Sequence, residues 1–124
     1  MLRVIAVLIT LISLVSGCAP HADLGRAEEV VKTSLEAWKG GEKPQQLTDR
    51  SIDIAEPDWK AGYRLVDFQV KNASSQPQQG PRVVVVLTLQ GRGGKTLNKE
   101  VAYEVIFKDG NKASIGRDAF HVGS

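Results

Sequence analysis

The sequence has few of the residues on which several classes of protein site depend. It contains one cysteine, Cys18, and only two histidines. A disulfide needs two cysteines, and a zinc site needs three or four convergent ligands. His21 and His121 lie near the two ends of the chain, outside the elements expected to form the core. We therefore expect no disulfide, no metal and no other cofactor.

Long hydrophobic runs and an excess of one charge are also missing. The longest apolar run covers residues 4–15, whereas a membrane-spanning helix needs about 20 apolar residues. Lysine and arginine number 16 against 14 acidic residues, and the two signs are interspersed. Nucleic-acid binding needs basic residues clustered on one face, so we expect no nucleic-acid partner. No repeat or low-complexity segment divides the 124 residues, which predict one domain.

What the N-terminus does contain is the pattern of an export signal. Arg3 precedes the apolar run, and the small residues Ser16 and Gly17 follow it. A basic start, a short apolar core and a small-residue cleavage site are typical of a signal peptide. Leu14 to Cys18 resembles a bacterial lipobox, in which an aliphatic residue and two small residues precede a cysteine.

This resemblance implies lipid attachment at Cys18 and signal cleavage between Gly17 and Cys18. It implies a lipoprotein whose acyl chains, such as palmitate, hold it on the outer side of a bacterial membrane, facing the periplasm or the exterior. The alternatives are an ordinary secretory signal followed by an incidental cysteine, or an uncleaved anchor helix. On the lipoprotein interpretation, residues 1–17 are the signal peptide, 18–22 a short tether, 23–120 the domain and 121–124 a tail.

Residues 24–39 have the pattern of an amphipathic helix. Apolar side chains recur every three or four residues and include Trp38 near the end. Asp23 can cap the first turn, and Gly40-Gly41 can end the helix in a left-handed conformation. Residues 42–62 are irregular, with a short strand possible at 51–54. We expect Leu47 and Trp59 from this segment to pack against the core.

The period changes to two from Tyr63 onward, which predicts strands. Their expected ranges are 63–71, 82–90, 97–108 and 112–120. The predicted fold is α+β, with one N-terminal helix packed on a curved four-stranded antiparallel sheet. In the first strand, alternation directs Val66, Phe68 and Val70 to one face and Leu65 and Asp67 to the other.

This order of elements resembles the cystatin-like and NTF2-like group of folds. NTF2-like enzymes often place an Asp or His beneath the sheet, and Asp67 is the nearest candidate. Alternation, however, directs Asp67 to the outer face, as it does Glu104. The inhibitory hairpin of cystatins, Q-x-V-x-G, is also missing, because Gln90 is followed by Gly91 and Arg92. Arg117 and Asp118 are expected to form a surface ion pair or a strand end, and no catalytic residue is predicted.

Strand 82–90 is apolar on both faces, although sheets packed on one side usually alternate. Leu65, Val84, Val86 and Ile106 would form an apolar patch on the outer face. Such a patch marks an interface, and the simplest partner is a second copy of the chain. The alternative is that a central strand has high β-propensity and the patch has no partner.

Two functions remain open at this point. The first is a small non-enzymatic lipoprotein that binds or supports components of the cell envelope. The second is an NTF2-like cone that holds a small hydrophobic ligand or an Asp-based active site. A cavity of a few hundred Å³ lined by inward polar groups would favour the second.

Overall fold

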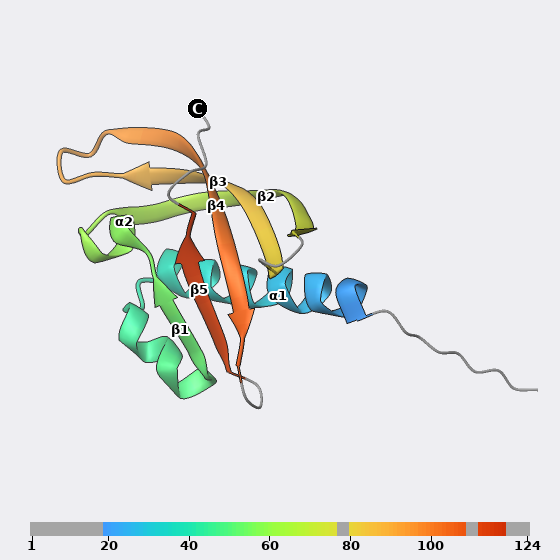
Figure 1. Cartoon of the computed structure of the whole chain (residues 1–124). Coiled ribbons are helices and arrows are strands. Elements are labelled where there is room, and N and C mark those ends of the chain that lie inside the picture. The colour runs from blue at the N-terminus through green and yellow to red at the C-terminus, as the bar shows by residue number, and fades with distance from the viewer. Residues whose placement is uncertain (1–18, 77–79, 109–111, 119–124) are drawn as a thin grey trace, which may run out of the picture.

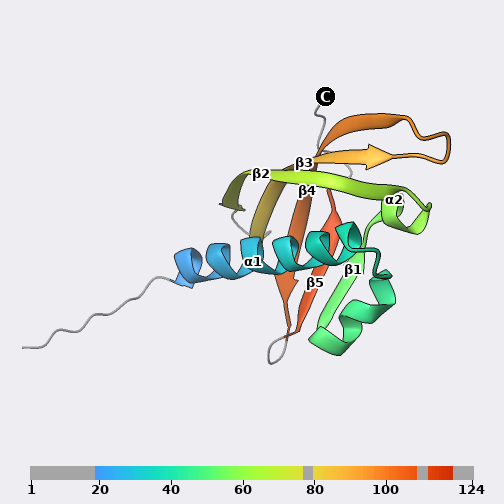
Figure 2. The same cartoon turned by 180° about the vertical axis from the view of Figure 1, so that it is seen from behind.

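The computed structural model describes residues 19–76, 80–108 and 112–118. One long helix lies across one face of a five-stranded sheet (Figures 1 and 2), so the expected α+β class is confirmed. In chain order the elements are α1 (Ala19–Lys39), the 3-10 helix η1 (Pro44–Arg50), β1 (Ile52–Ala55), α2 (Pro57–Lys60), β2 (Arg64–Gln76), β3 (Gly80–Gln90), β4 (Thr96–Phe107) and β5 (Ala113–Arg117).

The sheet is mixed, with the strand order β1-β5-β4-β3-β2. Neighbours from β2 to β5 are antiparallel, but β1 runs parallel to β5, from Ile52 opposite Ala113 to Ala55 opposite Gly116. The expectation of four antiparallel strands is therefore wrong in number and in the direction of one edge. Ile52 and Ile54 are buried and alternate with exposed residues, so this short segment has the pattern of a one-sided edge strand.

The apolar stripe of α1 packs against the sheet as its spacing predicts. Its most buried side chains, all 4% exposed or less, include Ala27, Val31, Leu35 and Trp38. The helix begins earlier than expected, at Ala19, so residues 19–22 continue the helix where a tether was predicted. Asp23 is consequently not a cap. It lies inside the helix, and its carboxylate is 3.7 Å from the guanidinium of Arg26.

The two glycines after α1 end it in a Schellman motif. Gly41 has a φ of 92°, a left-handed conformation that glycine adopts without steric penalty. The Gly41 N–H donates to the Trp38 carbonyl at 3.0 Å, and the Glu42 N–H donates to the Ala37 carbonyl at 2.9 Å. The chain then turns sharply into η1, which keeps Trp38 beside the segment that follows.

Bulges in β2 change which of its side chains face α1. The register with β3 shifts between Leu65 and Asp67, and again after Val70. Each bulge inserts an unpaired residue and reverses the alternation that follows. Leu65 is therefore in the core at 2% exposure and Val66 is 41% exposed, the reverse of the expected faces. Phe68 and Val70 pack against the core as expected.

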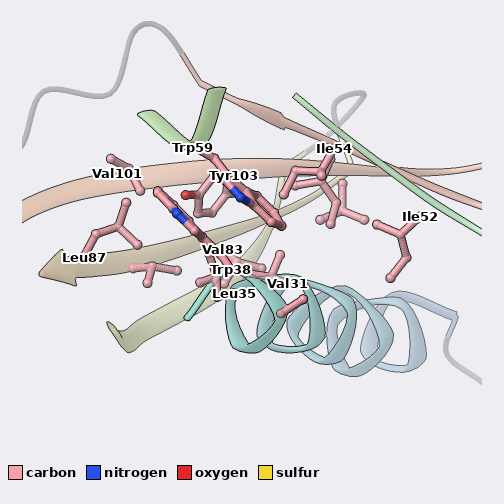
Figure 3. Packing of buried hydrophobic residues seen from close by; sticks show 14 of the residues in the cluster. Val31, Leu35, Trp38, Ile52, Ile54, Trp59, Val83, Leu87, Val101 and Tyr103 are labelled. Atoms are coloured by element: carbon pink, nitrogen blue, oxygen red, sulfur yellow. The ribbon is translucent and has the colours of Figure 1, made fainter. Parts of the chain in front are cut away.

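The core lies between α1 and the sheet (Figure 3), and it also includes residues of η1 and α2. Leu47 and Trp59 are both buried in it, which confirms their expected packing. Large side chains fill the space beneath the sheet. Those with essentially no exposed surface include Leu35, Leu47, Val83, Val85, Leu87, Tyr103 and Val105.

Candidate functional site

A charge cluster of five side chains joins α2 to the sheet: Glu56, Asp58, Lys99, Tyr103 and Arg117. Glu56 ends the segment after β1 and is only 1% exposed. Its carboxylate accepts hydrogen bonds from the Tyr103 hydroxyl, from the Asp58 N–H at 2.7 Å and from Arg117 Nη1 at 2.6 Å. The Asp58 bond also caps the start of α2, where Pro57 occupies the first turn.

Asp58 forms the second half of the cluster. Its Oδ2 accepts from Arg117 Nη1 at 3.1 Å, from Arg117 Nη2 at 3.0 Å and from Lys99 Nζ at 3.0 Å. Burial by itself raises the pKa of Asp58, but the hydrogen bonds from Lys99 and Arg117 outweigh it and hold the pKa below its ordinary value. Two acidic and two basic side chains thus balance each other in a confined space.

The pKa values of Tyr103 and Arg117 are shifted as well. Burial and the negative charge of Glu56 raise the pKa of Tyr103 well above its ordinary value, so its hydroxyl stays protonated and donates. Burial lowers the pKa of Arg117, but Glu56 and then Asp58 more than compensate and raise it. Each charge already has a partner at hydrogen-bond distance, and the arrangement holds α2 and Trp59 in place. It has the features of a structural network rather than of a catalytic pair.

Beside the cluster, two tryptophans stack in parallel. The ring centroids of Trp38 and Trp59 are 5.3 Å apart, and the ring planes differ by 9°. Trp38 Nε1 donates to the Tyr63 carbonyl at 2.9 Å, and Trp59 Nε1 donates to the Glu42 carbonyl at 3.1 Å. Both rings are therefore fixed in position as well as buried, and they join α1, α2 and the start of β2.

Three adjoining surface hollows of about 340, 370 and 350 Å³ lie at this end of the molecule; Trp59 lines the first two and Trp38 the second. Trp59 and Lys43 line both the first and the second hollow, and Gly62 and Tyr63 line both the second and the third. Because neighbouring hollows share walls, we treat them as one feature, the aromatic groove. It runs from Pro44 past the stacked rings to Arg92 at the β3–β4 turn.

A further hollow, of about 750 Å³, adjoins the aromatic groove at Glu42 and follows the charged face of α1. Its walls include Glu28, Glu29, Lys32 and Glu36 from the helix and Arg50 from η1. Lys32 pairs with Glu28 at 3.1 Å within the helix. The hollow is shallow and is lined mainly by solvated charged side chains, so it offers less for a ligand to contact than the aromatic groove.

The residues that the sequence analysis singled out as candidate site residues lie apart from the charge cluster. Gly17 and Cys18, the expected cleavage and lipid-attachment residues, lie outside the described residues, as does His121. Asp67 is on the outer face with 69% of its side chain exposed and pairs with Lys39 at 3.5 Å. Glu104 is half-buried and faces the same way.

The predicted apolar patch changes in composition. Leu65 is wrongly assigned to it, because the β2 bulge turns this side chain into the core. Val84 is 8% exposed, Val86 is half-buried and Ile106 is 55% exposed. Polar cross-strand pairs flank these residues on the same face, including Lys71 with Glu100 at 2.8 Å. The bulge thus exchanges Leu65 for Val66, which is 41% exposed, and the outer face carries both apolar residues and polar pairs.

Of the two interpretations of Arg117 and Asp118, the strand end is confirmed, because β5 ends at Arg117, and the surface ion pair is wrong. The two side chains point to opposite faces of β5 and its continuation, so Arg117 joins the charge cluster while Asp118 pairs with Arg82 at 2.8 Å. Alternation in the strands carries the missed signal. Arg117 is two residues from the buried Ile115, and Lys99 is two residues from the buried Val101, so alternation places each charged residue on the same face as its buried neighbour. A charged residue on a core-facing position predicts a buried partner.

Among the described residues, no group of three or more His, Cys, Asp and Glu side chains could hold a metal ion. Within the same part of the chain, no helix is both long enough and apolar enough to cross a bilayer. Comparisons of the chain with protein-family models, curated protein sequences and solved structures found no match.

Proposed function

We propose that the chain is a bacterial lipoprotein, anchored to the membrane through acyl chains on Cys18, with a non-enzymatic binding domain facing the periplasm or the exterior. The observation that carries the anchoring is the segment Leu14 to Cys18, with Arg3 and the apolar run before it. Each buried methylene contributes about 0.8 kcal/mol, so two or three acyl chains hold a protein of this size on a bilayer.

The start of α1 supports the same proposal. The helix begins at Ala19, immediately after the cysteine, so the domain would sit directly on the headgroups. With the helix rising about 1.5 Å per residue, residues 19–22 extend it by about 6 Å, far less than the ~17 Å reach of an extended tether. A domain held this closely suits a partner that comes to the membrane surface.

Binding is favoured over catalysis because the space beneath the sheet is filled. Tyr103, Leu35 and Val85 occupy it with no exposed surface, where an NTF2-like cone would hold its ligand. The acidic groups nearest to that space, Glu56 and Asp58, are already bonded within the charge cluster.

We extend the proposal to the fold group: one helix against a curved, largely antiparallel sheet supports a relationship to cystatin-like and NTF2-like domains. A homodimer through the outer face is less favoured, because polar pairs such as Lys71 with Glu100 lie among its apolar residues.

The anchoring is tested by intact mass spectrometry and fatty-acid labelling of the protein expressed in a bacterium. We expect a product that begins at Cys18 and carries the mass of the acyl chains. The Cys18→Ala variant should lose the label and accumulate as precursor, whereas Ser13→Ala, a small change inside the apolar run, should mature normally. A product that begins at Met1, or one cleaved but without added mass, would refute the anchoring.

A further inference from the structure

We propose that the aromatic groove binds an extended acidic peptide segment of a partner protein. This inference rests on the proposed binding function and names the chemistry of the partner. The groove is elongated, because its three hollows follow one another along the end of the molecule. Its walls come from the end of α1, the start of η1, α2, the start of β2 and the β3–β4 turn, and the stacked tryptophans join α1 to α2.

The charge of this end of the molecule is the first argument. Lys43, Lys60 and Arg92 line the groove, and none of them forms an ion pair with any residue in the described ranges. Arg64 also lines it, and its guanidinium makes one long hydrogen bond, 3.4 Å, to Gln90. Four cationic side chains are thus available along one groove.

The acidic side chains nearby are already neutralised. Glu42 accepts from Arg50 through both oxygens, at 3.1 and 3.2 Å, and Asp67 pairs with Lys39. Asp58 is held by the charge cluster. The surface around the groove therefore carries a net positive charge although the whole chain is close to neutral at +2. Such a surface attracts an anionic partner.

The position of the groove argues against the anchoring membrane as its partner. Figure 2 shows the C-terminal end of α1, α2 and the β3–β4 hairpin at one end of the molecule, with the start of α1 at the other. The 21 residues of α1 separate the two ends by about 30 Å. The groove is thus about three Debye screening lengths of ~10 Å from the anchored end of α1, so the anchor itself does not hold it against anionic headgroups.

The shape favours a peptide over a compact ion. The two arginines, Arg64 and Arg92, can each bind a carboxylate through two parallel hydrogen bonds. Between the cations, the ring edges of Trp38, Trp59 and Tyr63 and the bare backbone of Gly62 leave room for an extended main chain. Carboxylates spaced along a peptide would reach successive cations.

The test is a fluorescence titration of the full chain, purified in a mild non-ionic detergent, with a short oligoglutamate peptide. The only two tryptophans of the chain line the groove and report binding directly. At low ionic strength we expect saturable binding of oligoglutamate and none of oligoglutamine. The Arg64→Gln/Arg92→Gln variant should bind about tenfold more weakly, as expected for the loss of two exposed charged contacts.

The matched control is Lys108→Gln/Lys112→Gln, which removes the same charge from exposed positions at the β4–β5 turn, at the other end of β4. It should bind within about twofold of the unmodified chain. Equal binding by both double variants, binding of oligoglutamine, or binding of a sulfated polysaccharide but not of oligoglutamate would each overturn the inference.

The test is independent of lipidation. The Cys18→Ala chain should bind oligoglutamate as the unmodified chain does. If the unmodified chain is labelled with fatty acid but does not bind the peptide, the proposal for the groove is refuted and the anchoring stands. If the unmodified chain binds the peptide but is not labelled, the anchoring is refuted and the proposal for the groove stands.

Discussion

Replacing Arg117 with methionine tests the charge cluster most directly. The substitution keeps much of the side-chain volume but removes three hydrogen bonds, of 2.6, 3.0 and 3.1 Å, to Glu56 and Asp58. Asp58 keeps Lys99, whereas the Glu56 side chain, which is 0% exposed, is left without a cation. Breaking a buried ion pair on one side costs about 3–5 kcal/mol. Because Arg117 itself is 16% exposed, we expect the lower end, about 3 kcal/mol.

A loss of about 3 kcal/mol is a large part of the stability of a domain of this size, and it should lower Tm by about 15 °C. Urea unfolding followed by tryptophan fluorescence measures it. The control is Arg50→Met, which removes a partly exposed arginine paired with Glu42 and should cost about 1 kcal/mol or less. Adding Glu56→Gln to Arg117→Met removes the uncompensated charge and should restore about 1 kcal/mol or more. A loss under about 1 kcal/mol for Arg117→Met would show that Glu56 does not depend on this cation.

Three further predictions concern single groups. Because the pKa of Asp58 is held below its ordinary value of 3.8, its contribution to stability is present above that pH and lost as the pH falls through the lower folded value. Urea unfolding between pH 2 and 6 should therefore show a steeper acid loss for the unmodified chain than for Asp58→Asn, and parallel curves would contradict the shift. Tyr103→Phe leaves one oxygen of buried Glu56 without its donor and should cost about 1–3 kcal/mol in urea unfolding at neutral pH, so an unchanged midpoint would contradict this role. Gly41→Ala forces alanine to a φ of 92° and should cost about 1 kcal/mol, whereas Gly93→Ala, at a site with no positive φ, should have little effect, and equal thermal midpoints for the two would contradict the strain.

The sequence predicted those parts of the fold that depend on local periodicity. The stripe from Ala27 to Trp38 faces the sheet, and the double glycine after it ends the helix. Strands β3 and β4 bury the side chains that alternation assigns to the core, such as Val85 and Tyr103. In each case the sequence pattern and the element that it predicts involve the same few neighbouring residues, so a single sequence is sufficient to predict the element.

The errors arose where the structure depends on distant residues or on irregular backbone. The bulge beside Val66 leaves no mark in the alternation, and it moved Leu65 from the expected outer face to the core. The pairing of β1 with β5 joins segments about sixty residues apart, which local patterns cannot specify. The charge cluster was missed for the same reason, although the core-facing parity of Lys99 and Arg117 was visible in the strands.

The parallel pairing of β1 with β5 also sets the order in which the chain can fold. Ile52 pairs with Ala113, and Glu56 pairs with Arg117, so neither finds its partner until a segment about sixty residues further along the chain is free to fold. Contacts of such long sequence separation slow folding, because the loop between them must close first. A chain that ends just before β5 would have an open sheet edge and an unneutralised buried acid, and would be a substrate for proteolysis.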